Sequence, residues 1–199
     1  GMRRVHKKLI MLLRSLISLN KVSMEYATAC LPGSSTKEAV KRHLGKRYVY
    51  LLDIRDAYGS IDGLQLAEMI VDLGRRLPLT LDVGEVYNFL CRCCLLPGVG
   101  ESKSTGLVTG APASPVLFNL YCALSLDDQL GQLVDRYGLT YGRYLDDLVF
   151  SSDQPIGKRK RLAIRETVIN GGFSIAHHKS RCCDLTKGPV IIHGLGLDA

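Results

Sequence analysis

Three aspartates stand beside apolar segments of strand length, where an unpaired carboxylate is costly. Asp53 follows the run 48–52, and Asp146 and Asp147 lie between two short strand-like runs that are typical of a β-hairpin. If the strands are neighbours in one sheet, Asp53 and Asp146 meet at one edge, and this concentrated negative charge needs a compensating cation. Two Mg²⁺ ions about 3.5–4 Å apart, bridged by carboxylates, stabilise the attacking and leaving oxygens of phosphoryl transfer. The acids therefore predict a two-metal site.

The cysteines indicate no comparable site. The chain contains Cys30, Cys91, Cys93, Cys94, Cys122, Cys182 and Cys183. Three of them fall in one helical run, 85–96, and no second Cys or His arm completes a zinc site. An odd number of cysteines without regular spacing or a secretory leader is typical of reduced thiols, so we expect a cytoplasmic protein. The apolar stretches are shorter than the roughly 20 residues of a membrane span, and we expect no membrane association.

The overall composition is that of a folded domain with a basic surface. Of the 199 residues, 46% are hydrophobic and 23% are charged, which is enough for a core without disulfides. Lys and Arg number 26 against 19 Asp and Glu, and the net charge is +7. This balance favours a polyanionic partner without identifying it. Part of the charge lies on the amphipathic segment 8–19, which a solvated helix face explains equally well.

The elements that would position the acids follow from hydrophobic periodicity and turn residues. We expect helices over 8–19, from 36, over 63–76, 83–96, 114–136 and 158–169, and strands over 48–52, 139–144, 148–152, 173–175 and 190–193. Ser60 or Asp62 would cap the helix over 63–76, and Gly138 would end the helix over 114–136. This order predicts an α+β fold in which a sheet carries helices on one face.

Several motifs, in a fixed order along the chain, resemble the sequence boxes of reverse transcriptases. Tyr144-Leu145-Asp146-Asp147 matches the Tyr-x-Asp-Asp box, and residues 53–58 resemble the first catalytic box. Gly106 with residues 110–119 resembles the glycine-rich template and nucleotide box. Residues 172–175 with Lys179 and Arg181 resemble the fourth box, and residues 193–197 resemble the primer-grip strand. The resemblance covers about residues 25–198, and the stretch 29–43 looks more like bacterial retron and group II intron enzymes than like retroviral ones.

The resemblance implies a polymerase palm, which is a ferredoxin-like antiparallel sheet with helices on one face, together with part of the helical fingers. Residues 1–45 would form the partial fingers and residues 46–199 the palm, while residues 77–105 could return to the fingers side. No helical thumb is expected within these residues. Gly1 before Met2 is typical of a scar from tag removal.

The resemblance also implies catalytic roles. Asp53 and Asp146 would bind two Mg²⁺ ions, which Mn²⁺ could replace, with the carbonyl of Ile54 as a further ligand and Asp147 as a nearby acid. The primer 3′-hydroxyl would attack the α-phosphate in line. Lys179 would protonate the departing pyrophosphate or neutralise its charge.

Further positions would contact the nucleotide or the nucleic acid. Tyr58 corresponds to an aromatic gate against the ribose 2′-hydroxyl, although outside its box it is typical of a core aromatic. The other residues implied for nucleotide binding are Ile54, Arg55, Thr109 and Gly110. Those implied for the template and primer are Gly106, Ser114, Pro115, Asn119, Tyr144 and Gly194. Gly106 and Gly110 allow close backbone approach, and Ser114 and Pro115 would also open the helix over 114–136 as N-cap and N1.

The chain departs from the family pattern beside the nucleotide. Val108-Thr109 replaces the usual Pro-Gln before Gly110, and Thr109 is too short to replace the reach of the glutamine. The basic fingers strand that holds the triphosphate lies upstream of this region in relatives. The only nearby candidates for that role are Arg3, Arg4, Lys7 and Lys8.

Two functions of different classes follow from these observations. The first is an RNA-directed DNA polymerase domain that uses an RNA template, a DNA or RNA primer and deoxynucleoside triphosphates. The second is a catalytically weak or inactive RNA-binding module that resembles intron maturases. A nucleotidyl cyclase fits less well, because its glycine- and acid-rich signature is absent. The sequence indicates no oligomeric state.

Overall fold

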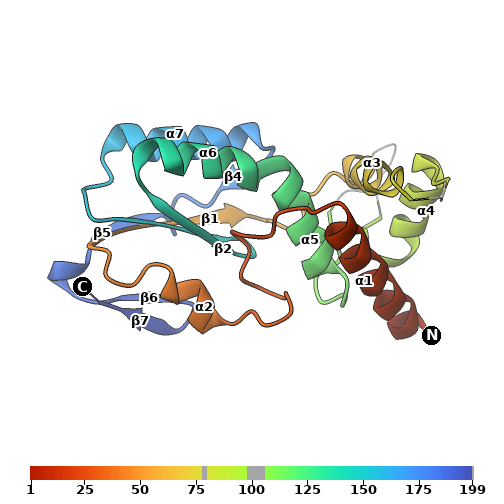
Figure 1. The fold of residues 1–199 in the computed structure, drawn as a ribbon, viewed down its shortest axis with the longest axis horizontal. Coiled ribbons are helices and arrows are strands. Elements are labelled where there is room, and N and C mark those ends of the chain that lie inside the picture. Colours follow the sequence, from red (N-terminus) through yellow and green to blue (C-terminus); the bar gives the residue numbers. More distant parts are fainter. Residues whose placement is uncertain (78–79, 98–105, 199) are drawn as a thin grey trace. The chain divides into compact units, whose positions relative to one another are not determined.

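The computed structural model describes residues 1–77, 80–97 and 106–198, and the chain folds into two compact units. The first unit comprises Gly1–Met24 and Asp56–Leu124, and the second comprises Glu25–Arg55 and Ser125–Ala199. Figure 1 shows their elements in chain order. Both units are therefore built from two separate stretches of the sequence.

The first unit is helical. Its helices are α1 (Met2–Leu19), α3 (Gly63–Gly74), α4 (Val83–Cys93) and α5 (Ser114–Cys122). Helix α1 packs on α3 and α5 through a stripe that includes the fully buried Leu13 and Leu16. Asp62, and not Ser60, caps α3, because its carboxylate accepts hydrogen bonds from the amides of the second and third helical residues.

The second unit contains the predicted sheet. Its five strands are β1 (Tyr48–Arg55), β2 (Thr140–Tyr144), β3 (Asp147–Ser152), β4 (Ser174–Ile175) and β5 (Arg181–Asp184). Strand β1 is central and every pairing is antiparallel: β3 and then β2 lie on one side of it, while β4 and β5 pair with different parts of its other edge. Strands β6 (Val190–Ile192) and β7 (Leu195–Leu197) form a separate hairpin.

Side chains that alternate along β1 build one core on each face of the sheet. The helices of this unit are α2 (Thr36–Lys41), α6 (Asp128–Tyr137) and α7 (Lys158–Asn170). Helices α6 and α7 cover one face, and α2 with the β6–β7 hairpin lies on the other (Figure 1). Val49 belongs to a buried cluster with Val40 of α2, Ile192 of β6 and Leu197 of β7. The α+β fold with an antiparallel sheet is confirmed, and α2 is the helix on the second face.

Three local predictions were incomplete. The predicted helix over 114–136 is interrupted by a π-helical segment, η1 (Ala123–Asp127), which lies between α5 and α6. The N-cap of α5 is Ala113 and not Ser114, whose hydroxyl instead donates to the carbonyl of Val108 at 2.7 Å. Strand β5 was not predicted, because Arg181-Cys-Cys-Asp184 lacks the alternation and the branched side chains that indicate a strand.

His43, just after α2, is an ionisable group inside the second unit. It is fully buried, and its Nδ1 lies 2.7 Å from the hydroxyl of Ser151. Its Nε2 has no hydrogen-bond partner among the described residues. Burial, followed by the charges of Arg42 and His193, lowers the pKa of His43 from 6.5 to about 3. The neutral imidazole is thus the form that the fold accommodates.

We therefore expect acid to destabilise the second unit through His43. The unfolded chain binds a proton near pH 6.5 and the folded chain only near pH 3, so this contribution is complete above pH 6.5 and is lost as the pH falls through this window. Between pH 6.5 and 5 the loss is about 2 kcal/mol of unfolding free energy. Urea unfolding at several pH values should show a shallower pH dependence for His43→Gln. The exposed His178→Gln is the control and should keep the slope of the wild type. Equal slopes for His43→Gln and the wild type would contradict this account.

Candidate active site

Antiparallel pairing brings Asp53, Asp146 and Asp147 together where β1 ends and β3 begins. We call this end of the sheet the acid edge. Asp53 on β1 is the register partner of Asp147 on β3. The amide of Ile54 donates to the carbonyl of Asp146 at 3.0 Å, which ties the hairpin turn to β1. On the other edge of β1, the amide of Ala176 donates to the carbonyl of Asp53 at 2.9 Å. The meeting of the β1 end with the hairpin, expected from the sequence, is thus observed.

A buried ion pair supports the hairpin that carries the acids. The Arg143 side chain is fully buried, and its Nη2 and Nε donate to Asp127 at 2.7 and 3.0 Å. Asp127 also accepts from the Tyr141 hydroxyl at 2.9 Å, and Arg143 Nη1 donates to the carbonyl of Leu145 at 3.3 Å. Leu145 has a positive φ of 56°, which is unfavourable for a residue with a side chain. The guanidinium therefore fixes the turn immediately before Asp146.

Burial and the neighbouring acids both act on the pKa of Asp146. Burial raises the pKa of Asp146, and the negative charges of Asp147 and Asp53 raise it further, whereas Lys179 lowers it. Lys179 Nζ lies 3.0 Å from Asp53 Oδ2, and this hydrogen bond and charge raise the pKa of Lys179. The lysine remains largely exposed, with 57% of its side chain accessible. The exposed ammonium of Lys179 thus already offsets part of the negative charge.

The donor types at this edge fit a hard divalent cation. Carboxylates and a backbone carbonyl are the ligands that Mg²⁺ prefers, and Asp53 is close enough to Asp146 for its negative charge to raise the pKa of Asp146. Within residues 1–77, 80–97 and 106–198, no three His, Cys, Asp or Glu side chains gather closely enough to hold a metal ion between them. An ion bound at this edge would therefore rely on Asp53, Asp146 and a backbone oxygen such as that of Ile54.

His193 joins the acids to the β6–β7 hairpin. Its Nδ1 lies 3.3 Å from Asp147 Oδ2, and its ring centroid lies 4.5 Å from that of Tyr144. The next residue, Gly194, is exposed with a φ of 79°, so it suits the tight turn between β6 and β7. Asp53, Asp147, Lys179 and His193 line one cavity of ≈ 380 Å³. The sequence placed His193 only at the start of a strand motif.

Two further predicted residues lie beside the acids on β1. Ile54 is buried, and its carbonyl belongs to the strand end. Arg55 is exposed opposite Ser174 of β4. With Asp53, Asp146, Asp147, Lys179, Tyr144 and Gly194, they are the predicted site residues of the second unit.

The remaining predicted residues belong to the first unit. Tyr58 is half-buried, with its ring centroid 5.2 Å from that of Phe118. Gly106 has a φ of 80°, and a Cβ there would lie 2.9 Å from Gly59 Cα, so glycine is required for packing. Gly110 has a φ of 85° and open space around it.

The other residues of this group differ in exposure. Thr109 is exposed, and Pro115 is half-buried in the first turn of α5. Ser114 and Asn119 are buried in α5. Any effect of Asn119 on a template would therefore pass through the residues packed on it.

Comparison with known proteins decides the family. Residues 2–190 match the family described as "Reverse transcriptase (RNA-dependent DNA polymerase)". The chain belongs to the reverse transcriptase family. It is 33% identical over 175 residues to the retron Mx65 reverse transcriptase of Myxococcus xanthus, and the match covers 85% of this chain and 40% of the relative. It is 26% identical over 156 residues to the retron Ec73 reverse transcriptase of Escherichia coli, which covers 75% of this chain and 47% of the relative. The chain thus spans under half the length of these relatives. Within the family, it belongs to the bacterial retron type.

Solved structures support the same fold. The apo telomerase of Candida tropicalis truncated from its C-terminal domain matches all of this chain and 44% of its own, with a TM-score of 0.63 and 13% identity. A telomerase of Candida albicans in complex with a fragment of telomeric RNA matches 94% of this chain and 36% of its own, with a TM-score of 0.64 and 13% identity. Among the helices of this family member that the structure describes, none has the length and apolar character to cross a membrane.

Removing Arg143 should destabilise the second unit strongly. Arg143→Met leaves the Asp127 carboxylate buried without its cation, which should cost about 3–5 kcal/mol of unfolding free energy in urea titrations. The exposed pair Lys46–Asp153, 2.7 Å apart, is the control, and Lys46→Met should cost less than about 1 kcal/mol. Arg143→Met combined with Asp127→Leu should recover part of the loss, because no unpaired charge remains. Similar costs for Arg143→Met and Lys46→Met would rule out a structural role for the buried pair.

Proposed function

We propose that this domain copies RNA into DNA by adding deoxynucleotides to a primer 3′-hydroxyl. One observation carries the proposal: Asp53 is paired with Asp147, and the Asp146 backbone is bound to Ile54, in a chain of the reverse transcriptase family. Gathering carboxylates at one sheet edge is costly unless cations bind there. The gathered carboxylates therefore favour a site that binds cations.

The acids would serve as cation ligands. Asp53 and Asp146 would bind two Mg²⁺ ions, or Mn²⁺, with the Ile54 carbonyl as a further ligand and Asp147 as a nearby acid. Bound divalent ions supply Lewis acidity, which makes the 3′-hydroxyl more acidic and stabilises charge on the phosphates. The raised pKa of Asp146 supports this assignment, because an added cation would relieve the repulsion that Asp53 and Asp147 exert on it.

Lys179 would act on the leaving group. In the transfer, a bond forms between the 3′-oxygen and the α-phosphorus, and the bond from that phosphorus to pyrophosphate breaks. Lys179 holds a proton at Nζ beside Asp53 and remains exposed, so it can reach an incoming phosphate. It would give that proton to pyrophosphate or neutralise the charge that develops there.

The first unit would contribute the nucleotide and template contacts. Tyr58 would exclude the ribose 2′-hydroxyl, and its packing against Phe118 would hold its ring in place. Thr109 and Gly110 are exposed, and the open space around Gly110 would admit a ligand close to the backbone. Gly106, Ser114, Pro115 and Asn119 would shape the template side, and Tyr144 and Gly194 of the second unit would contact the primer.

The domain assignment is part of the same proposal. Residues 46–199 would form the palm and residues 1–45 partial fingers, and the presence of all three acids in the second unit supports a palm there. Residues 77–105 could return to the fingers side, and 78–79 and 98–105 of this stretch lie outside the described residues. All seven cysteines lie among the described residues and none of them forms a disulfide, which supports a reducing compartment such as the bacterial cytoplasm. The partners would be an RNA template, a DNA or RNA primer and deoxynucleoside triphosphates.

Primer extension on an RNA template with Mg²⁺ tests the proposal in the protein at its natural full length. Asp146→Asn should lower the rate by at least about a thousandfold, because it removes a charged cation ligand. Lys179→Gln should lower the rate by about a hundredfold or more. Asp135→Asn changes an exposed aspartate of α6 and should leave the rate unchanged. A wild-type protein that binds RNA but extends no primer would support the maturase-like binding module and overturn the polymerase proposal.

A further inference from the structure

A second cavity lies along the same sheet, at the end of β1 that is remote from the acids. It has a volume of ≈ 900 Å³, and its wall runs from Tyr48, the first residue of β1, to Ile191 of β6. Five residues separate Tyr48 from Asp53, or about 17 Å along a strand. The acids at the other end of β1 do not line this cavity.

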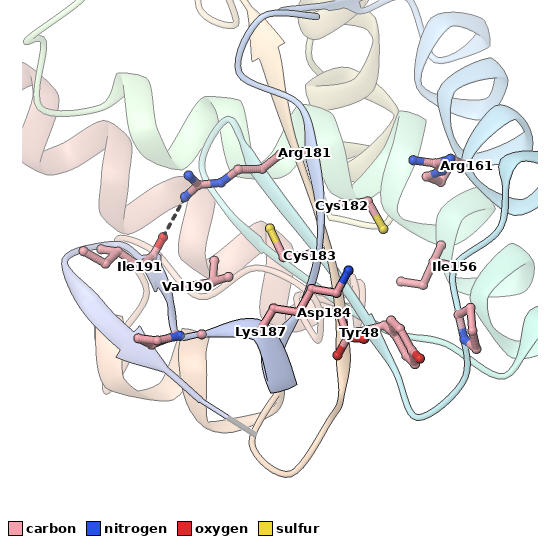
Figure 2. A pocket seen from close by; sticks show the side chains of 13 residues that line it. Tyr48, Ile156, Arg161, Arg181, Cys182, Cys183, Asp184, Lys187, Val190 and Ile191 are labelled. Carbon is pink, nitrogen blue, oxygen red and sulfur yellow. Dashed lines mark hydrogen bonds between the residues drawn. The ribbon is translucent and has the colours of Figure 1, made fainter.

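Three cations from three elements line this cavity. Arg161 comes from α7, Arg181 from β5 and Lys187 from the short 3-10 helix η2 (Leu185–Lys187) (Figure 2). No Asp or Glu of the described residues lies within ion-pair distance of these three side chains. Arg181 is held by a hydrogen bond from Nη2 to the carbonyl of Ile191 at 3.3 Å, drawn as a dashed line in Figure 2.

The single carboxylate in the wall does not neutralise them. Asp184 accepts hydrogen bonds from Arg47 at 3.1 and 3.2 Å and from the hydroxyl of Thr186 at 2.7 Å. These contacts lower the pKa of Asp184 to about 2, so its charge is constant but already paired. The cavity therefore has a net positive charge, and its cations repel one another. A polyanion would relieve this repulsion.

An aromatic ring adds a second recognition element. Tyr48 is half-buried and lines the cavity, with the Arg47 guanidinium 5.0 Å from its ring centroid. Cationic side chains beside an aromatic ring are the combination that binds single-stranded nucleic acid, because phosphates pair with the cations and a base stacks on the ring. An acidic peptide would use the cations but not the ring.

The cavity also adjoins the cavity at the acids. Arg181 and Ile191 line both this cavity and the cavity that contains Asp53, Asp147 and Lys179. A strand seated near Tyr48 would lie about five nucleotides from the acids at 3.4 Å per nucleotide. A nucleic-acid strand that binds in one cavity can therefore extend along the sheet to the other.

We propose that the cavity formed by Tyr48, Arg161, Arg181 and Lys187 binds a single-stranded segment of RNA, as a site separate from the acid edge. The binding of phosphates and the stacking of a base follow from the residues of the cavity itself. The choice of RNA over DNA rests on the proposed function. The site holds RNA through its phosphates and one stacked base, so it adds affinity without selecting a sequence.

The test measures binding of a fluorescent 12-nucleotide RNA to the full chain with EDTA present, so that ions at the acid edge do not contribute. The triple variant Arg161→Gln, Arg181→Gln, Lys187→Gln should bind on the order of tenfold more weakly and should lower the slope of log affinity against log salt by about 2. The charge-matched control replaces the exposed Lys37, Arg76 and Arg136 by Gln and should change both quantities much less. Tyr48→Leu should weaken binding about tenfold, whereas Tyr48→Phe keeps the ring and should bind as the wild type does.

Alkylation by a maleimide locates the bound strand. Cys182 lines the cavity and Cys30 does not, and both residues are exposed. At free RNA about ten times its Kd, alkylation of Cys182 should slow about tenfold, whereas that of Cys30 should not change. Equal behaviour of the two thiols, or of the triple variant and its control, would overturn the proposal.

Two competitors identify the ligand class. If a polyglutamate peptide competes as effectively as RNA does, the assignment of the ligand to RNA is wrong. Tenfold tighter binding of DNA of the same sequence would also contradict this assignment. Primer extension is not the readout, so Asp146→Asn should retain the binding and the protection of Cys182. Failure of this site is thereby distinguished from failure of the polymerase proposal.

Discussion

Strand β1 is hydrogen-bonded along both of its edges, and the arrangement of the candidate site depends on this pairing. Strand β3 on one edge brings the Asp146-Asp147 turn to Asp53. Strands β4 and β5 on the other edge flank the segment that carries Lys179, whose ammonium reaches Asp53. A one-residue slip of β3 against β1 would place Asp53 and Asp147 on opposite faces of the sheet. The site is therefore a consequence of strand register more than of any loop.

The concentration of charge that results is stabilised at two levels. Lys179 offsets the acids directly and lies on the solvent side of them. Arg143 acts from within, because its buried pair with Asp127 and its bond to Leu145 hold the hairpin turn in a conformation that is otherwise unfavourable. One cation is exposed and the other is buried. This division suits a site that must keep its shape while its ligands change.

The acids could be predicted from the sequence because a carboxylate beside an apolar strand is unusual, and because a hairpin and an antiparallel sheet limit where such groups can meet. Arg143 and Asp127 were missed for a related reason. In the sequence, each looks like an ordinary charged residue on the surface of its own element. Asp127 is buried against β2 at the end of the π-helical segment, which adds a residue to the helical turn, and no sequence pattern indicated that segment. The cavity at Tyr48 was not predictable either, since its cations come from α7, β5 and η2, which are brought together by the pairing of β5 with β1. Local patterns thus predicted the elements, whereas long-range partners depended on the tertiary fold.

We propose that the β1–β3 register makes Asp53 and Asp146 a joint site for divalent cations. Titration of the chain with Mn²⁺, followed by the electron paramagnetic resonance signal of the free ion and without nucleic acid or nucleotide, tests it most directly. We expect that the wild type removes Mn²⁺ from the free pool and that Asp53→Asn and Asp146→Asn each weaken this binding by at least about tenfold. Exposed Asp135→Asn should bind Mn²⁺ as the wild type does. Wild-type affinity in both of the first two variants would contradict the account.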